Sequence, residues 1–316
     1  MAKAKKPVKK SSRRGEKKPV EKVLRTGAKK MNPFTIMIVA NPALETPWNS
    51  GTFVVDPVTS NQSAFDACAQ YILDALFGKL PNQREALLAD PTIGPQVRVV
   101  SLFVSGLPAQ DPNALVAQDG LSNLLVARRS VFVPFLAQYG LQADVAYAVS
   151  ASASHDRATA WFTSDDDACL GCPFALDGVT LYHRHYNLIP GTVAMHTNSK
   201  SLTALHEFGH ALSSYSNGSV VDLYVDSSAG LNNKRGRPIP AIFATYSGIA
   251  LAPDMARDGL SYPPGWQSYH CELIDPAVPA VMDNYWAAPS GVPEYCLHDK
   301  ITRQFLRERL LVKICR

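Results

Sequence analysis

Several features that define common protein classes are missing from this 316-residue sequence. No stretch reaches the roughly 18 uninterrupted apolar residues that a membrane-spanning helix needs. The chain has no internal repeat and no glycine-rich phosphate loop, which argues against a repeat protein and against a P-loop enzyme. Its hydrophobic fraction of 46% and charged fraction of 18% are ordinary for a soluble globular protein.

We also expect no secretory signal. The mostly apolar run over residues 34–40 is at the short limit for such a signal, and Asn41 and Pro42 end it without a small-x-small cleavage site. The run is better interpreted as a buried first strand. We therefore expect a cytoplasmic protein with no membrane span.

Cysteine is sparse, with six residues in the chain. Cys169 and Cys172 have the CxxC spacing that can bind zinc or form a disulfide. A structural zinc site needs four ligands, and Cys271 and Cys296 do not form a second CxxC pair. Unpaired thiols are ordinary in a cytoplasmic protein. The sequence leaves open whether Cys169 and Cys172 pair or bind a metal.

Positive charge is concentrated at the start of the chain. Residues 1–30 contain thirteen of the 31 Lys and Arg residues and two of the 27 acids, so this arm carries +11 and the remainder −7. The arm has few aromatic or branched apolar residues and is predicted to be disordered. Three interpretations are open: a solubilising tail, an upstream extension before a start at Met31, or an electrostatic arm for nucleic acid, anionic lipid or an acidic partner.

The remaining residues, 31–316, predict one mixed α/β unit in which helices pack on a mixed sheet. Expected strands cover residues 34–40, 97–104, 144–150 and 191–196. Expected helices cover residues 61–80, 121–139 (broken near Pro134), 200–214 and 299–313. No linker divides the unit, so we expect an N-terminal half (31–216) and a loop-rich C-terminal half (217–316) with a cleft between them.

One pentapeptide, His206-Glu207-Phe208-Gly209-His210, has the spacing that metal chemistry requires. Residues four apart on a helix lie on the same face, so His206 and His210 can present two imidazoles to one ion. Glu207 can then reach a water on that ion. This HExxH pattern resembles the zincin metallopeptidases, which implies one catalytic Zn²⁺, a zincin-like fold and Glu207 as general base.

The third metal ligand departs from the strict metzincin pattern, because Ser213 and Ser216 occupy the positions where that pattern has Gly and a third His or Asp. The segment is more similar to the IgA-peptidase type of zincin, where HEFGH precedes an Asp-x-Tyr segment after a shorter gap. That resemblance implies Asp222 as the third ligand, with Asp226 and Glu272 as alternatives.

A further similarity lies at Met282 and Tyr285. Metzincin-like sites have a Met-containing turn under the metal, often followed by a Tyr. The resemblance implies that Tyr285 assists catalysis by donating a hydrogen bond to the oxyanion. His270, Tyr246 and Tyr224 are alternatives for that role, and a core Met with a packed aromatic residue is the structural alternative.

These observations predict a zinc-dependent metallopeptidase that acts on peptides or proteins. The strand over residues 193–196 is expected to hold an extended peptide at the edge of the sheet. One alternative is a nucleic-acid-associated protein that binds through residues 1–30 and has a regulatory or degenerate metal site. Another is an HExxH hydrolase of a non-peptide amide. The substrate and the oligomeric state are not predicted.

Overall fold

The structure, a computed structural model, describes most of the chain up to residue 212 and shorter pieces beyond it. The described residues are 19–28, 33–80, 86–120, 123–161, 163, 173–176, 179–182, 190–199, 201–212, 219–220, 244–246, 249–252, 268–269, 281 and 300–314. These ranges leave most of the predicted C-terminal half (217–316) outside the described residues. Within them, no helix combines the length and the apolar character that crossing a membrane requires.

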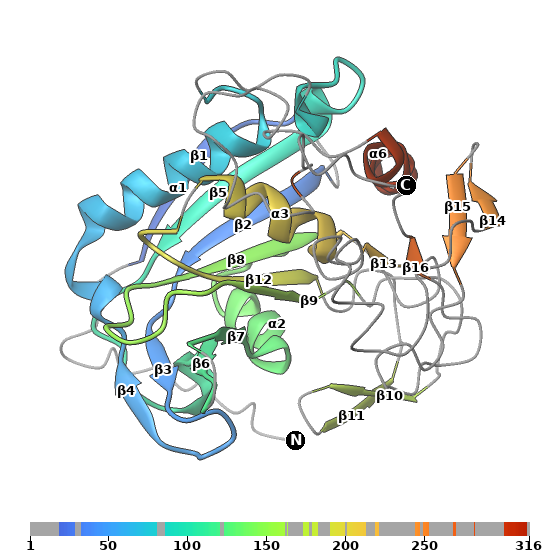
Figure 1. Ribbon diagram of the computed structural model, residues 1–316. Helices are drawn as coiled ribbons and strands as arrows, with labels where there is room; N and C mark the ends of the chain where they lie inside the picture. The colour runs from blue at the N-terminus through green and yellow to red at the C-terminus, as the bar shows by residue number, and fades with distance from the viewer. Residues whose placement is uncertain are drawn as a thin grey trace, which may run out of the picture.

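A six-stranded mixed sheet forms the centre of the fold (Figure 1). In spatial order its strands are β1 (Val20–Arg25), β5 (Val97–Phe103), β2 (Phe34–Ala40), β8 (Val145–Ser150), β12 (Gly191–His196) and β9 (Thr159–Trp161). The four inner strands are parallel, and both edge strands are antiparallel to their neighbours. Strands buried on both faces read as continuous apolar runs, which is why the sequence located the four inner strands correctly.

Helices and a second sheet cover the two faces of this central sheet (Figure 1). On one face α1 (Gln62–Leu76), α3 (Ser201–Ala211) and α6 (Lys300–Ile314) share a hydrophobic core with the sheet. On the other lie α2 (Arg129–Ala137) and residues of a four-stranded sheet. That second sheet consists of β4 (Phe53–Val55), β3 (Ala43–Glu45), β6 (Val116–Gln118) and β7 (Leu125–Ala127). The predicted mixed α/β class is confirmed.

The smaller elements complete the described chain. Four short 3-10 helices are η1 (Pro57–Ser60), η2 (Leu87–Ala89), η3 (Gly94–Gln96) and η4 (Asp111–Asn113). A hairpin joins β10 (Pro173–Leu176) to β11 (Val179–Tyr182). A third sheet contains β13 (Ser219–Val220), β16 (Ser268–Tyr269), β15 (Ile249–Ala252) and β14 (Ala244–Tyr246).

Close contact between β12 and α3 sets the position of the helix. A Cβ atom on Gly191 would lie 1.8 Å from the carbonyl oxygen of Ala211, a separation that no real pair of atoms tolerates. Only glycine therefore fits at the start of β12, where the last turn of α3 rests on the sheet. At its other end α3 is tied to β8, because the Tyr147 hydroxyl donates a hydrogen bond to Ala204 O at 2.9 Å.

The predicted disordered arm is wrong at its C-terminal end, because β1 forms an edge strand from within residues 1–30. Backbone pairing with β5 compensates for the small apolar content of β1. Its basic side chains also have specific partners: Lys22 pairs with Asp66, and Arg25 donates to Gly94 O while stacking on Phe77. Residues 1–18 lie outside the described part of the chain.

The single helix predicted over residues 121–139 is also wrong. Asn123 adopts a left-handed backbone with φ of 53°, a conformation that interrupts a helix. The apolar residues that follow form β7 instead, and α2 begins only at Arg129. Pro134 lies inside α2 rather than dividing a longer helix. The periodicity could not distinguish a short buried strand followed by a short helix from one continuous helix.

Candidate active site

The predicted metal-binding helix is present as α3, directly after β12. A tight turn joins the two elements: Ser199 N–H donates to His196 O at 2.9 Å, and the Ser199 hydroxyl accepts from His196 N–H at 3.1 Å. The apolar face of α3, including Leu205 and Phe208, is buried against the sheet. This packing fixes the HExxH residues relative to the carboxyl ends of the parallel strands.

His206 and His210 lie next to each other on α3, as their spacing predicted. Their Nε2 atoms are 3.3 Å apart, and the two rings meet nearly edge to face at 83°. His206 is buried, and its Nδ1 lies 2.7 Å from Val281 O. A carbonyl oxygen only accepts hydrogen bonds, so Nδ1 carries a proton, and in the neutral form of the ring Nε2 then holds the lone pair.

This arrangement fits two ligands of one zinc ion. Two nitrogens bound tetrahedrally at about 2.0–2.1 Å from zinc lie about 3.3–3.4 Å apart, which matches the separation of the two Nε2 atoms. An Nδ1–H···O=C bond is also the outer contact that orients metal-binding histidines. Among the described residues no group of three His, Cys, Asp or Glu side chains could hold a metal, so a third ligand would come from elsewhere in the chain.

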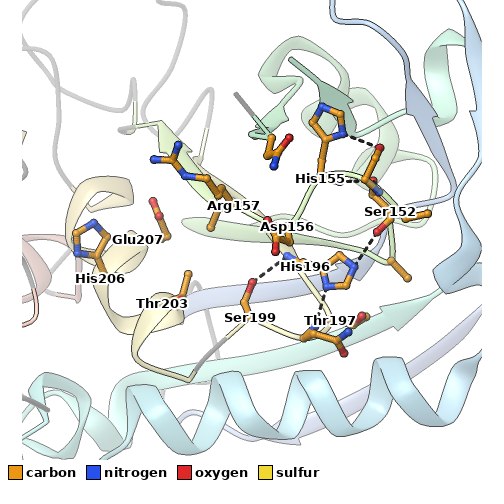
Figure 2. A pocket seen from close by; sticks show the side chains of 16 residues that line it. Ser152, His155, Asp156, Arg157, His196, Thr197, Ser199, Thr203, His206 and Glu207 are labelled. Carbon is orange, nitrogen blue, oxygen red and sulfur yellow. Dashed lines mark hydrogen bonds between the residues drawn. The ribbon is translucent and has the colours of Figure 1, made fainter. Parts of the chain in front are cut away.

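Glu207 and His206 both line one pocket (Figure 2). The side chain of Glu207 is largely buried, with 6% of the residue exposed. Burial and, secondly, the negative charge of Glu207 raise the pKa of the Tyr147 phenol well above its ordinary value. Tyr147 therefore stays protonated and keeps its hydrogen bond to α3.

The pocket has a volume of about 1060 Å³ and opens at the carboxyl ends of β8 and β12. Its lining is mostly polar: hydroxyl, amide, imidazole and charged side chains outnumber the three alanines among the described residues. The described lining residues are Asn123, Ala151, Ser152, Ala153, Ser154, His155, Asp156, Arg157, Ala158, His196, Thr197, Asn198, Ser199, Thr203, His206 and Glu207. The volume suits a few residues of an extended peptide.

A hydrogen-bonded network builds the wall opposite α3 (Figure 2). His196 Nε2–H donates to Ser152 O at 3.0 Å, and the Asn198 N–H donates to His196 Nδ1 at 3.0 Å. The Gln118 amide donates to the Ser152 hydroxyl at 2.6 Å. His155 contacts the Ser154 hydroxyl and Asp119 O at 2.8 and 2.9 Å.

The sequence did not identify this wall. One available signal was the polar run that follows a buried strand at residues 150–157. Another was His196 at the end of the next parallel strand, since the carboxyl ends of such strands meet at one edge of a sheet.

The edge strand was misassigned. Strand β12 is an inner strand, paired with β8 on one side and with β9 on the other. The edge is β9, a three-residue strand whose shortness hid it in the sequence. Val193 and Ala194 therefore have a strand on both sides.

Several predicted site residues lie outside the described part of the chain: Asp222, Asp226, Glu272, Met282, Tyr285, Cys169 and Cys172. The described residue next to Met282 is informative, because Val281 is buried and its carbonyl oxygen accepts the hydrogen bond from His206. Val281 thus contacts α3. Elsewhere, burial raises the pKa of the Cys68 thiol to about 12, so that cysteine is unreactive.

No protein-family model matches the chain, and no curated protein matches it. The function is therefore inferred from the chemistry of the site.

Proposed function

We propose that this protein is a zinc-dependent metallopeptidase. One observation carries the proposal: the Nε2 atoms of His206 and His210 lie at the separation of two zinc ligands, with the His206 tautomer set by Val281 O. Glu207 lies beside them at the edge of a peptide-sized pocket. Asp222 is the proposed third ligand, with Asp226 and Glu272 as alternatives, and Tyr285 is the proposed oxyanion donor.

The proposed reaction is hydrolysis of a peptide bond by water. A zinc ion held by the two imidazoles would lower the pKa of a bound water and polarise the scissile carbonyl. Glu207 accepts the proton that the attacking water loses and donates it to the leaving amine as the C–N bond breaks. The products are a carboxylic acid and an amine, and Glu207 returns to its starting charge.

The edge of the central sheet offers a place for the peptide backbone. No further strand among the described residues pairs with the outer side of β9. A substrate in extended conformation can add there as another strand, so its backbone would be bound without regard to sequence. Ala158, immediately before β9, lines the pocket, so the start of this strand lies next to it.

The central test is Glu207→Gln, with Glu21→Gln as the matched control. Glu21 is exposed on β1 and does not line the pocket. We expect Glu207→Gln to retain zinc and to lose about 10²- to 10⁴-fold in kcat, whereas Glu21→Gln keeps both. Metal analysis and a chelator-sensitive assay on a mixed peptide library measure the two properties. Full hydrolysis by Glu207→Gln would disprove the role of this residue.

The third ligand is tested separately. Zinc stoichiometry is measured for Asp222→Ala, Asp226→Ala and Glu272→Ala. We expect the largest loss of zinc for Asp222→Ala. Unchanged zinc in that variant, with a loss in one of the other two, would reassign the ligand.

A second candidate function is nucleic-acid binding through the basic arm. It is favoured by residues 1–18, which contain nine Lys or Arg residues and one acid, Glu16. Because β1 belongs to the central sheet, the test variant should lack residues 2–18 and keep Val20–Arg25. Binding to DNA or RNA that falls steeply with salt, and is lost in this variant, would support the function. Cleavage of acyl amides but not peptides would instead indicate a non-peptide amide hydrolase.

A further inference from the structure

The charge distribution in the pocket is uneven. Among the described residues that line it, Arg157 is the one Lys or Arg, and Asp156 and Glu207 are the acids. The other described lining residues are three histidines and residues with uncharged side chains. An arginine keeps its charge at any physiological pH, so Arg157 gives the pocket a fixed positive point.

The backbone of Arg157 is held in place. Its N–H donates to Asn123 O at 3.1 Å, and its carbonyl oxygen accepts from Leu125 N–H at 2.8 Å. These bonds form a parallel bridge centred on Leu124, and β9 begins two residues later. The base of the side chain is therefore fixed relative to the edge strand.

The guanidinium of Arg157, in contrast, has no ion pair or side-chain hydrogen bond with any described residue. Other arginines differ: Arg128 pairs with Glu45 at 2.9 Å, and Arg307 pairs with Asp90 at 2.8 Å. Arg157 is exposed, and Figure 2 shows its side chain extending towards the side of the pocket where Glu207 and His206 lie. Arg157 thus combines a backbone held by hydrogen bonds with an exposed, charged side chain, which is suited to binding a ligand.

The chemistry of the ligand follows from these neighbours. The planar guanidinium fork matches the two oxygens of a carboxylate. A doubly charged phosphate would suffer stronger repulsion from Asp156 and Glu207, which line the same pocket. The favoured ligand group is therefore a singly charged carboxylate.

We propose that Arg157 is a specificity residue that binds a carboxylate of the peptide substrate. The proposal rests on the proposed peptidase function and adds a substrate class, peptides with an acidic group near the scissile bond. That carboxylate belongs either to an Asp or Glu side chain or to the C-terminus of the peptide. The two sources share the same chemistry at Arg157 and are separated by experiment.

The test compares matched peptides on the full-length, zinc-loaded protein. Starting from one cleaved peptide, Glu, Gln or Lys is placed at each position flanking the scissile bond, and each peptide is made with a free or an amidated C-terminus. We expect a preference in kcat/KM of about 10- to 100-fold for Glu over Gln at one position, or for the free acid over the amide.

The variants identify the residue responsible. Arg157→Gln should abolish that preference and leave kcat/KM for neutral peptides within about threefold, because only a charged contact is lost. Arg98→Gln is the control, since Arg98 lies on β5 and does not line the pocket. An equal loss of kcat for all peptides in Arg157→Gln would overturn the proposal, because Arg157 would then act on the reaction itself.

A binding measurement separates this proposal from the peptidase function. Fluorescence anisotropy gives Kd for labelled acidic and neutral peptides on Glu207→Gln and on the double variant Glu207→Gln/Arg157→Gln. We expect tighter binding of the acidic peptide to the first protein only. Equal binding of both peptides to Glu207→Gln would overturn the proposal. If the acidic peptide binds selectively but the unmutated protein hydrolyses no peptide, carboxylate binding by Arg157 stands and the peptidase function is rejected.

Discussion

Two buried histidines on opposite walls of the pocket have different surroundings. His196 at the end of β12 uses both ring nitrogens for backbone contacts, with Ser152 O and with Asn198 N–H. His206 on α3 contacts Val281 O through Nδ1, and its Nε2 lies 3.3 Å from Nε2 of His210. The two residues are 8% and 4% exposed. Burial and residue type thus do not distinguish a structural histidine from a candidate ligand. The partner of the second ring nitrogen does: it is a backbone group for His196 and another imidazole for His206.

The largest expected effect comes from exchanging the two histidines for alanine one at a time. His206→Ala should lose stoichiometric zinc and hydrolysis, with kcat/KM reduced at least about 100-fold. His196→Ala should keep zinc but unfold more easily, by about 1–3 kcal/mol, because it leaves buried backbone groups without partners. Metal analysis and urea unfolding measure these effects. Loss of zinc from His196→Ala would contradict the assignment of His196 as structural and His206 as a ligand.

A smaller effect is expected from Tyr147→Phe, which removes the hydrogen bond that ties α3 to β8. The free energy of unfolding should fall by about 1 kcal/mol. Zinc should stay bound, because the HExxH side chains are retained. Urea unfolding combined with zinc analysis tests this expectation. A stability equal to that of the unmutated protein would mean that packing alone holds α3.

The smallest effect concerns Asp56, which supports the wall that carries His196. Its carboxylate accepts from the backbone N–H groups of Val58 and Ala151 and from the Asn41 amide. Burial is the largest influence and raises the pKa of Asp56 above the ordinary 3.8, although these hydrogen bonds oppose it.

A carboxyl group whose pKa is raised in the folded state adds most to the free energy of unfolding at pH values below its ordinary pKa. The contribution is lost as pH rises through the folded-state pKa. The stability difference between the unmutated protein and Asp56→Asn should therefore shrink as pH rises from about 3.5 to 7. Urea unfolding at several pH values measures it, and a difference that grows with pH would contradict the expected sign.

The sequence predicted the elements that depend on local pattern. The apolar runs gave the four inner strands, and the His206–His210 spacing gave a helix that brings both imidazoles together. Contacts between distant residues were not predictable in this way. Val281 is 75 residues from His206, and it contributes a backbone oxygen that no residue type reveals.

The outer strands and the polar wall show the same limit. Strand β1 forms by pairing with the edge of β5, and β9 has only three residues. Neither strand has a run of apolar or alternating residues long enough to be recognised in the sequence. Ser152 and His196 are neighbours only because β8 and β12 pair in parallel register. Arg157 was not singled out, because an exposed arginine in a polar segment is ordinary until the pocket is known.

The contact between Gly191 and Ala211 has a consequence for how the site tolerates sequence change. A single methyl group at position 191 would collide with the last turn of α3, and His210 is the residue just before Ala211. Relief of that collision would lift this turn from the sheet and move His210 relative to His206. The spacing of the two candidate metal ligands therefore depends on Gly191, a residue on a different element. Gly191 has no reactive group and matters because it has no side chain.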